Sequence, residues 1–185
     1  QELKRQYLSR GRYAVTVTTT VTPLERNRVA INFNVDEGEV AKIRQINIIG
    51  AKVFSEKDLL GLFVLRTPGL MTWWSKHDQY SRQKLSADLE VLRSHYLDRG
   101  YLEFNIDSTQ VTISPDKRDI FISIGVTEGP KYTVSEVKVA GEMLLPEAEI
   151  LKLITVKPGE VFSRTRITES TKNISDRLGN DGYAF

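Results

Sequence analysis

The side chains best suited to metal binding are scarce in this sequence. It contains two histidines, His77 and His95, and no cysteine among 185 residues. A protein metal site needs three or four converging ligands, and no group of His, Asp or Glu here has a spacing that brings such a set onto one helix face or turn. Without cysteine, disulfides and thiolate ligands are also excluded. The sequence therefore predicts no metal site.

The pair His77-Asp78 is the best candidate for catalysis, because a carboxylate often orients a histidine base. Residues adjacent in a chain rarely face each other, however, and no nucleophile signature accompanies the pair. His95 lies beside Tyr96 on an expected helix, where a surface or half-buried position is favoured. We therefore expect no catalytic residues and no enzymatic activity.

A short glycine pattern at 179–182, GNDG, matches the GxxG loop that clamps nucleic acid in KH domains. That loop joins two helices and is usually basic, whereas this one carries Asp181 and follows a predicted helix, so a helix end is the better interpretation. The 26 basic and 24 acidic residues leave a net charge of +2, which gives no argument for a nucleic-acid surface. Phosphate-binding and dinucleotide-binding glycine motifs are absent from the sequence as well. We predict neither nucleic acid nor a cofactor as a ligand.

The elements that carry these residues follow from an internal repeat, because the stretch 118–141 resembles the stretch 27–50 at an offset of 91 positions. Each copy has an alternating apolar strand, an acidic residue with glycine, and a second strand that ends in glycine. The alternating residues are Val29, Ile31, Phe33 and Val35 in the first copy and Ile120, Ile122, Ile124 and Val126 in the second. This alternation predicts that one face of each strand packs on a core. A fixed offset over this length indicates repeated domains.

The complete module has the element order β-α-α-β-β. Ser55 is a predicted N-cap of its first helix, and Gly100 can end its second helix, expected at about 81–99, in a left-handed conformation. The apolar face of the second helix is Leu85, Leu89, Leu92 and Tyr96. The predicted domains are 1–40, the C-terminal part of one module; 41–130, a complete module; and 131–185, the N-terminal part of a further module. The predicted class is α+β, with each module a three-stranded mixed sheet covered on one face by two helices.

The strand expected at 101–114 holds the candidate binding site. Its apolar residues change parity between Ile106 and Val111, which predicts a β-bulge near 107–109. If the last strand of the module lies centrally, this strand is a sheet edge with unpaired N–H and C=O groups, and proline at Gln110 is expected to remove one of them. The predicted protein-binding residues are Phe104, Asn105, Ile106, Asp107, Ser108, Thr109, Gln110 and Val111. The bulge is compatible with protection of the edge and with a shaped docking site.

Two other kinds of segment are candidates for contacts. Trp73 and Trp74 lie in an insertion between the helices, where they either anchor a partner or fold back to cap the helices. The inter-module links are Glu37-Gly38 and Glu128-Gly129. Because these links are short, neighbouring modules are expected to touch and to swing over a restricted range.

Most of the chain resembles a known repeat. The resemblance lies in VTPLERNRVAINFNVDEGEVAKIRQINIIG, in the insertion with two tryptophans, and in RQKLSADLEVLRSHYLDRGYLEFNIDSTQVTISPDKRDIFISIGVTEGPKY. These stretches resemble the periplasmic polypeptide-transport-associated (POTRA) repeats of the outer-membrane β-barrel assembly factors of Gram-negative bacteria. They correspond to the end of the second repeat, the whole third repeat and most of the fourth.

The resemblance implies a periplasmic region that assists the folding and insertion of outer-membrane β-barrel proteins, with no catalytic residues. Its implied partners are unfolded β-barrel clients and accessory outer-membrane lipoproteins, with periplasmic chaperones as further candidates. The resemblance also implies membrane attachment through a barrel absent from this chain. No apolar run in the sequence approaches the ~20 residues of a membrane-spanning helix. Strand addition at a module edge is one expected mechanism. One alternative is a pure scaffold that holds lipoproteins and never contacts a client. Another is a set of repeats from a related secretion transporter, which the stretch VTPLERNRV disfavours.

Overall fold

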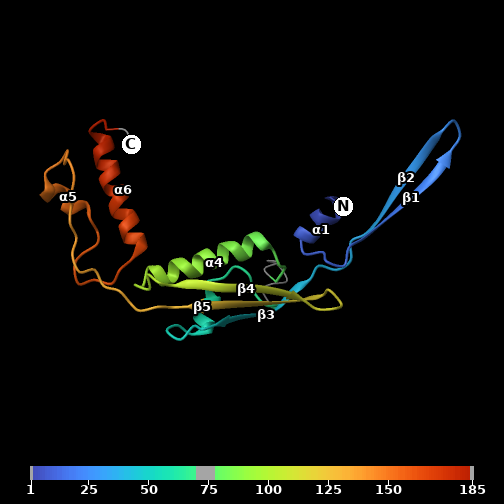
Figure 1. The fold of residues 1–185 in the computed structure, drawn as a ribbon, viewed down its shortest axis with the longest axis horizontal. Coiled ribbons are helices and arrows are strands. Elements are labelled where there is room, and N and C mark those ends of the chain that lie inside the picture. Colours follow the sequence, from blue (N-terminus) through green and yellow to red (C-terminus); the bar gives the residue numbers. More distant parts are fainter. Residues whose placement is uncertain (1, 70–77, 184–185) are drawn as a thin grey trace.

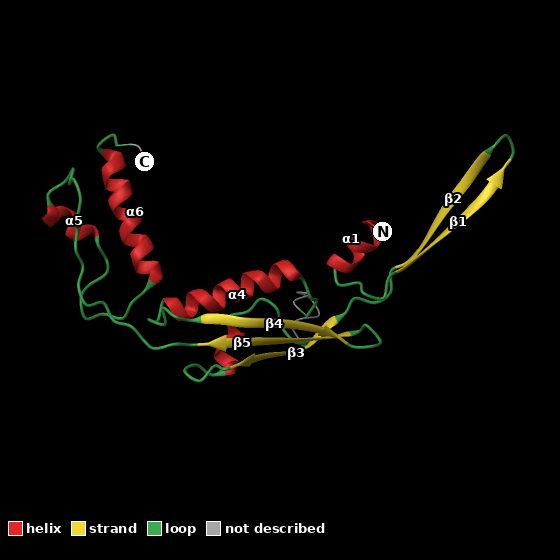
Figure 2. Cartoon of the chain, in the orientation of Figure 1, coloured by secondary structure: helices red, strands yellow, loops and turns green. Residues whose placement is uncertain are grey.

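The computed structural model describes residues 2–69 and 78–183, which form three units along an extended chain (Figure 1). The helices are α1 (Glu2–Ser9), α2 (Glu56–Gly61), α4 (Arg82–Leu97), α5 (Glu147–Leu153) and α6 (Arg164–Asn180). The strands are β1 (Thr16–Leu24), β2 (Arg28–Asp36), β3 (Lys42–Ile49), β4 (Asn105–Ile113) and β5 (Asp119–Thr127). The first unit ends in the hairpin of β1 and β2, the middle unit contains β3, β4, β5 and α4, and the third contains α5 and α6 (Figure 2).

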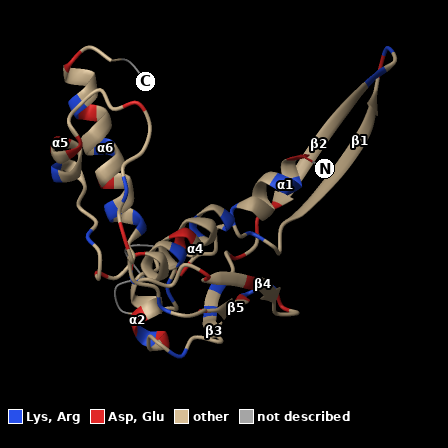
Figure 3. Ribbon diagram, turned by 60° about the vertical axis from the view of Figure 1, so that its left-hand side comes forward, with Lys and Arg blue, Asp and Glu red and all other residues tan. Residues whose placement is uncertain are grey.

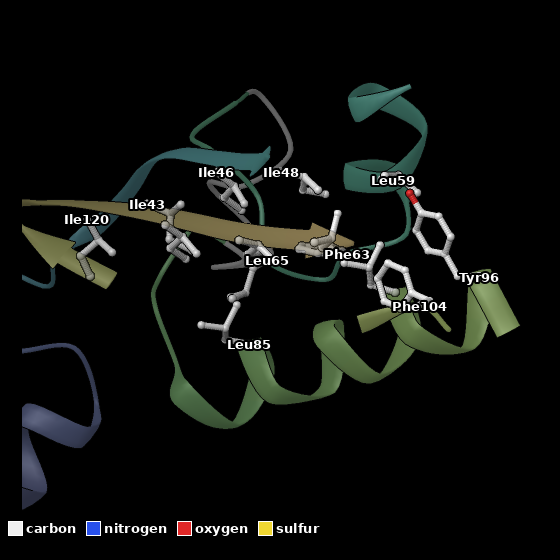
Figure 4. Packing of buried hydrophobic residues seen from close by; sticks show 14 of the residues in the cluster. Ile43, Ile46, Ile48, Leu59, Phe63, Leu65, Leu85, Tyr96, Phe104 and Ile120 are labelled. Atoms are coloured by element: carbon white, nitrogen blue, oxygen red, sulfur yellow. The ribbon is translucent and has the colours of Figure 1, made fainter. Parts of the chain in front are cut away.

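The middle unit is built on a mixed sheet with the strand order β3-β5-β4. β3 runs parallel to β5, and β4 runs antiparallel to it. One face of the sheet packs against the helices and forms the core (Figure 4). Its largest fully buried apolar side chains are Tyr96, Phe63, Ile43, Leu59, Leu65, Leu92, Ile120, Ile122 and Ile124. The predicted α+β class, the element order and the central position of the last strand are confirmed.

Local sequence signals set the ends of the helices in the middle unit. The Ser55 hydroxyl accepts a hydrogen bond from the Asp58 N–H at 3.1 Å, which confirms the predicted N-cap of α2. Gly100 has a φ of 94° beyond the end of α4, in the left-handed region where a side chain is disfavoured. Ser55 therefore marks the start of α2 after β3, and Gly100 marks the end of α4 before β4.

The buried face of α4 differs from its predicted face at one position. Leu85, Leu92 and Tyr96 are buried as expected, whereas Leu89 is only half-buried. Asp88 is buried instead, and its carboxylate accepts hydrogen bonds from the Val64 N–H at 2.7 Å and the Leu65 N–H at 2.9 Å. These bonds satisfy backbone donors that would otherwise be buried without a partner. The apolar spacing identified the face but not this carboxylate.

The hairpin of β1 and β2 carries the alternating apolar pattern but leaves it exposed. Its register runs without a shift from Thr16↔Asp36 to Leu24↔Arg28, so β1 has no bulge, unlike the equivalent strand β4. Val17 and Val35, near the base of the hairpin, are partly buried, but its other large apolar residues are exposed, from 50% for Leu24 to 65% for Phe33. The expectation that this face packs on a core is wrong for the described residues, because the hairpin projects away from the other elements (Figure 1).

The third unit lacks an expected strand. The repeat predicts a strand at 131–141, equivalent to β3, but the structure has only an isolated bridge there, Thr133↔Val161. β3 is held by its neighbour β5, and among the described residues no strand lies in the equivalent place beside 131–141. A strand cannot form a ladder without a neighbour, so this segment stays irregular although its sequence resembles β3.

Candidate protein-binding edge and repeat junctions

β4 forms a free edge of the middle sheet and contains a bulge. Its pairing with β5 shifts register between Ile106 and Ser108, so Asp107 is the extra residue and the predicted bulge is confirmed. The Asp107 carboxylate accepts hydrogen bonds from the Thr127 hydroxyl and the Asn105 side-chain amide, both at 2.7 Å. A Cβ on Gly125, opposite the bulge, would lie 2.7 Å from the Ser108 hydroxyl oxygen. The bulge is therefore fixed by side chains on both strands.

The register determines which backbone groups β4 presents at the free edge. The Ser114 N–H donates to the Asp119 carbonyl at 2.9 Å where the two strands meet their turn. Bonded and non-bonded pairs alternate in an antiparallel ladder, so the Gln110 N–H points toward β5. The N–H and C=O groups of Thr109 and Val111 consequently lie on the free edge. The expectation that proline at Gln110 would block the edge is wrong, since it would remove a bond within the sheet.

Most of the predicted binding residues lie on this edge. Asn105, Asp107, Ser108, Thr109 and Gln110 are exposed, while Ile106 and Val111 are partly buried and pack against the core. Phe104 is a correction, because it precedes β4, is 4% exposed and stacks on Tyr96 with ring centroids 4.1 Å apart. It is a core residue, placed by a turn before the strand begins. Trp73, Trp74 and His77 lie outside the described residues.

The link after β5 is anchored to the core by Glu128, which is 9% exposed. Its carboxylate accepts hydrogen bonds from the Tyr96 hydroxyl at 2.8 Å and from the Val53 N–H at 3.1 Å. Burial, reinforced by the bond to Glu128, raises the pKa of Tyr96 far above its ordinary value. The first unit has the same pair, because the Tyr7 hydroxyl donates to Glu37 at 3.1 Å. In each unit, a tyrosine on the helix therefore holds the glutamate that begins the following link.

The glycines after these glutamates adopt left-handed conformations, with φ of 61° for Gly38 and 69° for Gly129. A Cβ on Gly38 would lie 2.8 Å from the Ala14 Cβ, and one on Gly129 would lie 2.8 Å from the Glu103 Cβ. Only glycine allows both this backbone conformation and this close approach. The Glu-Gly links therefore hold the chain tightly against the preceding loop.

The units also contact each other through an equivalent backbone bond. The Ala41 N–H donates to the Gly11 carbonyl at 3.0 Å, and the Tyr132 N–H donates to the Gly100 carbonyl at 2.8 Å. We call the contact between the first and middle units the first junction, and that between the middle and third units the second junction. At both junctions the next unit begins against the glycine that follows the preceding helix.

The second junction has an additional carboxylate. Asp98, at the end of α4, accepts hydrogen bonds from the Thr165 N–H at 2.8 Å, the Thr165 hydroxyl at 2.7 Å and the Ser163 hydroxyl at 3.3 Å. Burial alone would raise the pKa of Asp98, but these hydrogen bonds and the nearby Arg99 guanidinium outweigh it and lower the pKa. The position equivalent to Asp98 in the first unit is Ser9, 89 residues earlier. The two junctions share backbone geometry but differ in charge.

Sequence reasoning missed the Tyr–Glu pairs and Asp98 for different reasons. Tyr7 and Tyr96 repeat at 89 positions and Glu37 and Glu128 at 91, so their joint repetition was an available signal for the pairs. Asp98 has no acidic counterpart, and its role depends on where the next unit sits.

In residues 2–69 and 78–183 the structure shows no group of three metal-binding side chains and no helix long and apolar enough to cross a membrane.

These features define a class of protein: tandem small α+β modules of order β-α-α-β-β, joined by short Glu-Gly links. A family model described as surface antigen variable number repeat, POTRA, matches residues 1–38, 41–129 and 132–185. The chain belongs to the POTRA family.

The relatives of the chain are outer-membrane protein assembly factors. It is 36% identical over 184 residues to BamA of Neisseria meningitidis serogroup B, covering 99% of the chain and 23% of that protein. It is 33% identical over 183 residues to BamA of Buchnera aphidicola, covering 98% of the chain and 29% of that protein. The structure of Haemophilus influenzae BamA POTRA3-5 matches with a TM-score of 0.60 at 18% identity, over 97% of this chain and 67% of that one, which supports the fold. The chain is thus similar to the non-enzymatic POTRA region of BamA and spans about a quarter of these two relatives.

Proposed function

We propose that this chain is a periplasmic docking region of an outer-membrane protein assembly machine. Its membership of the POTRA family and its similarity to two BamA proteins support this role. Residues 41–130 form the complete repeat, flanked by the C-terminal part of one repeat in 1–40 and the N-terminal part of another in 131–185. A barrel elsewhere in the longer protein attaches the region to the outer membrane.

The proposed mechanism is transient strand addition to β4 by unfolded β-barrel clients. The observation that carries it is the free edge, where Thr109 and Val111 direct backbone groups away from β5. Backbone pairing makes binding tolerant of client sequence. The single nine-residue strand offers much less area than the ~1,200–2,000 Å² of a stable interface, so binding is weak and the client can be released.

A second candidate function is that of a scaffold that holds folded partners, such as accessory lipoproteins or periplasmic chaperones. It is favoured by apolar side chains on the helix-free face of the middle sheet, where Ile49 is 61% exposed and Phe121 is 36% exposed. A folded partner would contact these side chains and not the edge backbone. The two functions therefore make separable predictions about which residues matter.

Thr109→Pro is the sharpest test of strand addition. Thr109 is exposed and its N–H points outward, so proline removes one edge donor while the bonds to β5 remain. Isotopically labelled chain would be titrated with an unfolded peptide whose sequence is that of a barrel strand. In the unchanged protein, amide shifts are expected along β4. Losing a hydrogen bond should weaken binding by roughly three- to tenfold in Thr109→Pro.

Thr109→Ala is the matched control, because it shortens the same side chain and keeps the N–H. It should bind like the unchanged protein. Equal binding by a still-folded Thr109→Pro variant would rule out augmentation at this edge. Shifts that cluster around Ile49 and Phe121 when a folded lipoprotein is added, with none along β4, would favour the scaffold.

A further inference from the structure

A basic groove lies at the first junction, between α1 and the beginning of α4. Its volume is about 880 Å³. Its lining residues are Arg5, Leu8, Ser9, Arg10, Tyr13, Tyr80, Arg82, Gln83 and Ser86. The lining thus contains three arginines and two tyrosines but no acidic side chain. Basic positions on α1 are visible in Figure 3.

The arginines of the groove are poorly neutralised by the chain itself. Arg5 forms an exposed contact with Glu2 at 3.7 Å. Within residues 2–69 and 78–183, no carboxylate lies within 4 Å of the guanidinium of Arg10 or Arg82 to form a salt bridge. Like charges that face a common groove repel one another, and a bound anion relieves that repulsion.

The second junction shows what fills the equivalent place within this same chain. There the Asp98 carboxylate receives three hydrogen bonds from Ser163 and Thr165 at the start of α6. At the first junction the equivalent positions hold Ser9, Ser81 and Gln83, so the backbone bond is shared but the carboxylate is missing. Ser9 instead donates its hydroxyl to the Gln6 carbonyl of its own helix at 2.8 Å.

The walls of the groove favour a peptide over a small anion. Tyr13, Tyr80 and Leu8 supply apolar surface beside the arginines. The tyrosine hydroxyls are neutral donors near neutral pH, and burial raises their pKa further above its ordinary value of 10.0. A groove of this size is far larger than one phosphate or carboxylate, and it combines charged with aromatic contacts, as protein interfaces do.

We propose that the groove binds an acidic segment of a partner protein, with an Asp or Glu carboxylate of that segment taking the place that Asp98 occupies at the second junction. Arg5, Arg10 and Arg82 supply the charge. A bound segment contacts both α1 and α4 and thereby holds the first and middle units together. This site is separate from the β4 edge and does not depend on strand addition there.

The test uses the labelled chain 1–185 and two synthetic peptides with blocked ends. One peptide alternates glutamate with glycine, and the other has glutamine in place of each glutamate. The acidic peptide is expected to shift amides at the start of α4 and along α1, with affinity that falls as salt rises. Arg82→Gln and Arg10→Gln should each weaken binding by about fivefold to tenfold, as expected for loss of a charge-assisted bond.

Two further variants distinguish binding in the groove from non-specific attraction of the acidic peptide to positive charge. Arg93→Gln makes the same charge change on α4 outside the groove and should bind normally. Ser9→Asp places a carboxylate at the position equivalent to Asp98 and should compete with the peptide although no arginine is lost. Equal binding of the acidic and glutamine peptides, or equal losses in Arg82→Gln and Arg93→Gln, would overturn the proposal. Tighter binding of inorganic phosphate, or of vesicles containing phosphatidylglycerol, at the same amides would overturn it in favour of a phosphate site.

Discussion

β2 and β5 share one sequence pattern but have opposite environments. Ile31 in β2 and Ile122 in β5 are 91 positions apart, yet Ile31 is 53% exposed and Ile122 is 1% exposed. β5 is central, with a strand on each side and helices over one face, whereas β2 pairs with β1 alone. The alternation of apolar residues therefore predicts which face of a strand can be buried. Whether that face is buried depends on elements that lie elsewhere in the chain.

The two junctions give a second comparison of the same kind. Their backbone bonds, through the Gly11 and Gly100 carbonyls, are nearly identical. Their side chains differ, because Asp98 bonds the next helix at one junction and Ser9 leaves a basic groove at the other. The two junctions therefore share a backbone hydrogen bond but differ in the side chains beside it.

The largest expected difference is between Ile122→Ala and Ile31→Ala. Truncating Ile122 leaves a cavity in the core and should lower the free energy of unfolding by about 2–5 kcal/mol. Truncating the exposed Ile31 should change it by less than about 0.5 kcal/mol. Urea unfolding combined with amide hydrogen exchange in β5 and β2 measures both. Similar losses at the two positions would mean that β2 also packs on a core.

The Tyr–Glu pairs should show a smaller difference in the same direction. Tyr96→Phe leaves the Glu128 carboxylate, which is 9% exposed, without one of its donors, and should cost about 1–3 kcal/mol of unfolding free energy. Tyr7→Phe removes the equivalent bond to Glu37 at an exposed site and should have little effect. Thermal unfolding of the two variants makes the comparison. A larger loss in Tyr7→Phe would show that the first link matters more than its exposure indicates.

The sequence predicted the parts of the fold that depend on local pattern. The alternation from Ile120 to Val126 gave the central strand, the parity change after Ile106 gave the bulge, and Gly100 gave the helix end. The sequence-based prediction failed where a strand needs a neighbouring strand to form. The segment 131–141 resembles β3 in sequence but is irregular in the structure.

The candidate site also has features that the local pattern predicts and features that depend on residues distant in sequence. The location of the edge could be predicted, because it depends on strand order and alternation. The direction of each N–H could not, since it required the register beside Ser114. The buried Asp88 and the inter-unit contacts of Asp98 also depend on residues distant in sequence, and helix spacing does not report them.

The smallest expected effect separates the two junctions by pH. The pKa of Asp98 is lowered in the folded chain, so the stabilisation by its hydrogen bonds is complete above the ordinary carboxyl pKa of 3.8 and is lost as pH falls through the lower folded value. The Thr165 amide, which donates to Asp98 at 2.8 Å, should shift in NMR spectra as that carboxyl is protonated. Asp98→Asn should abolish this titration. The Gln83 amide, in the equivalent place opposite Ser9, should show no transition of this kind. A matching transition at Gln83 would mean that another carboxyl reaches the first junction, and that the charge difference between the two junctions is smaller than the structure indicates.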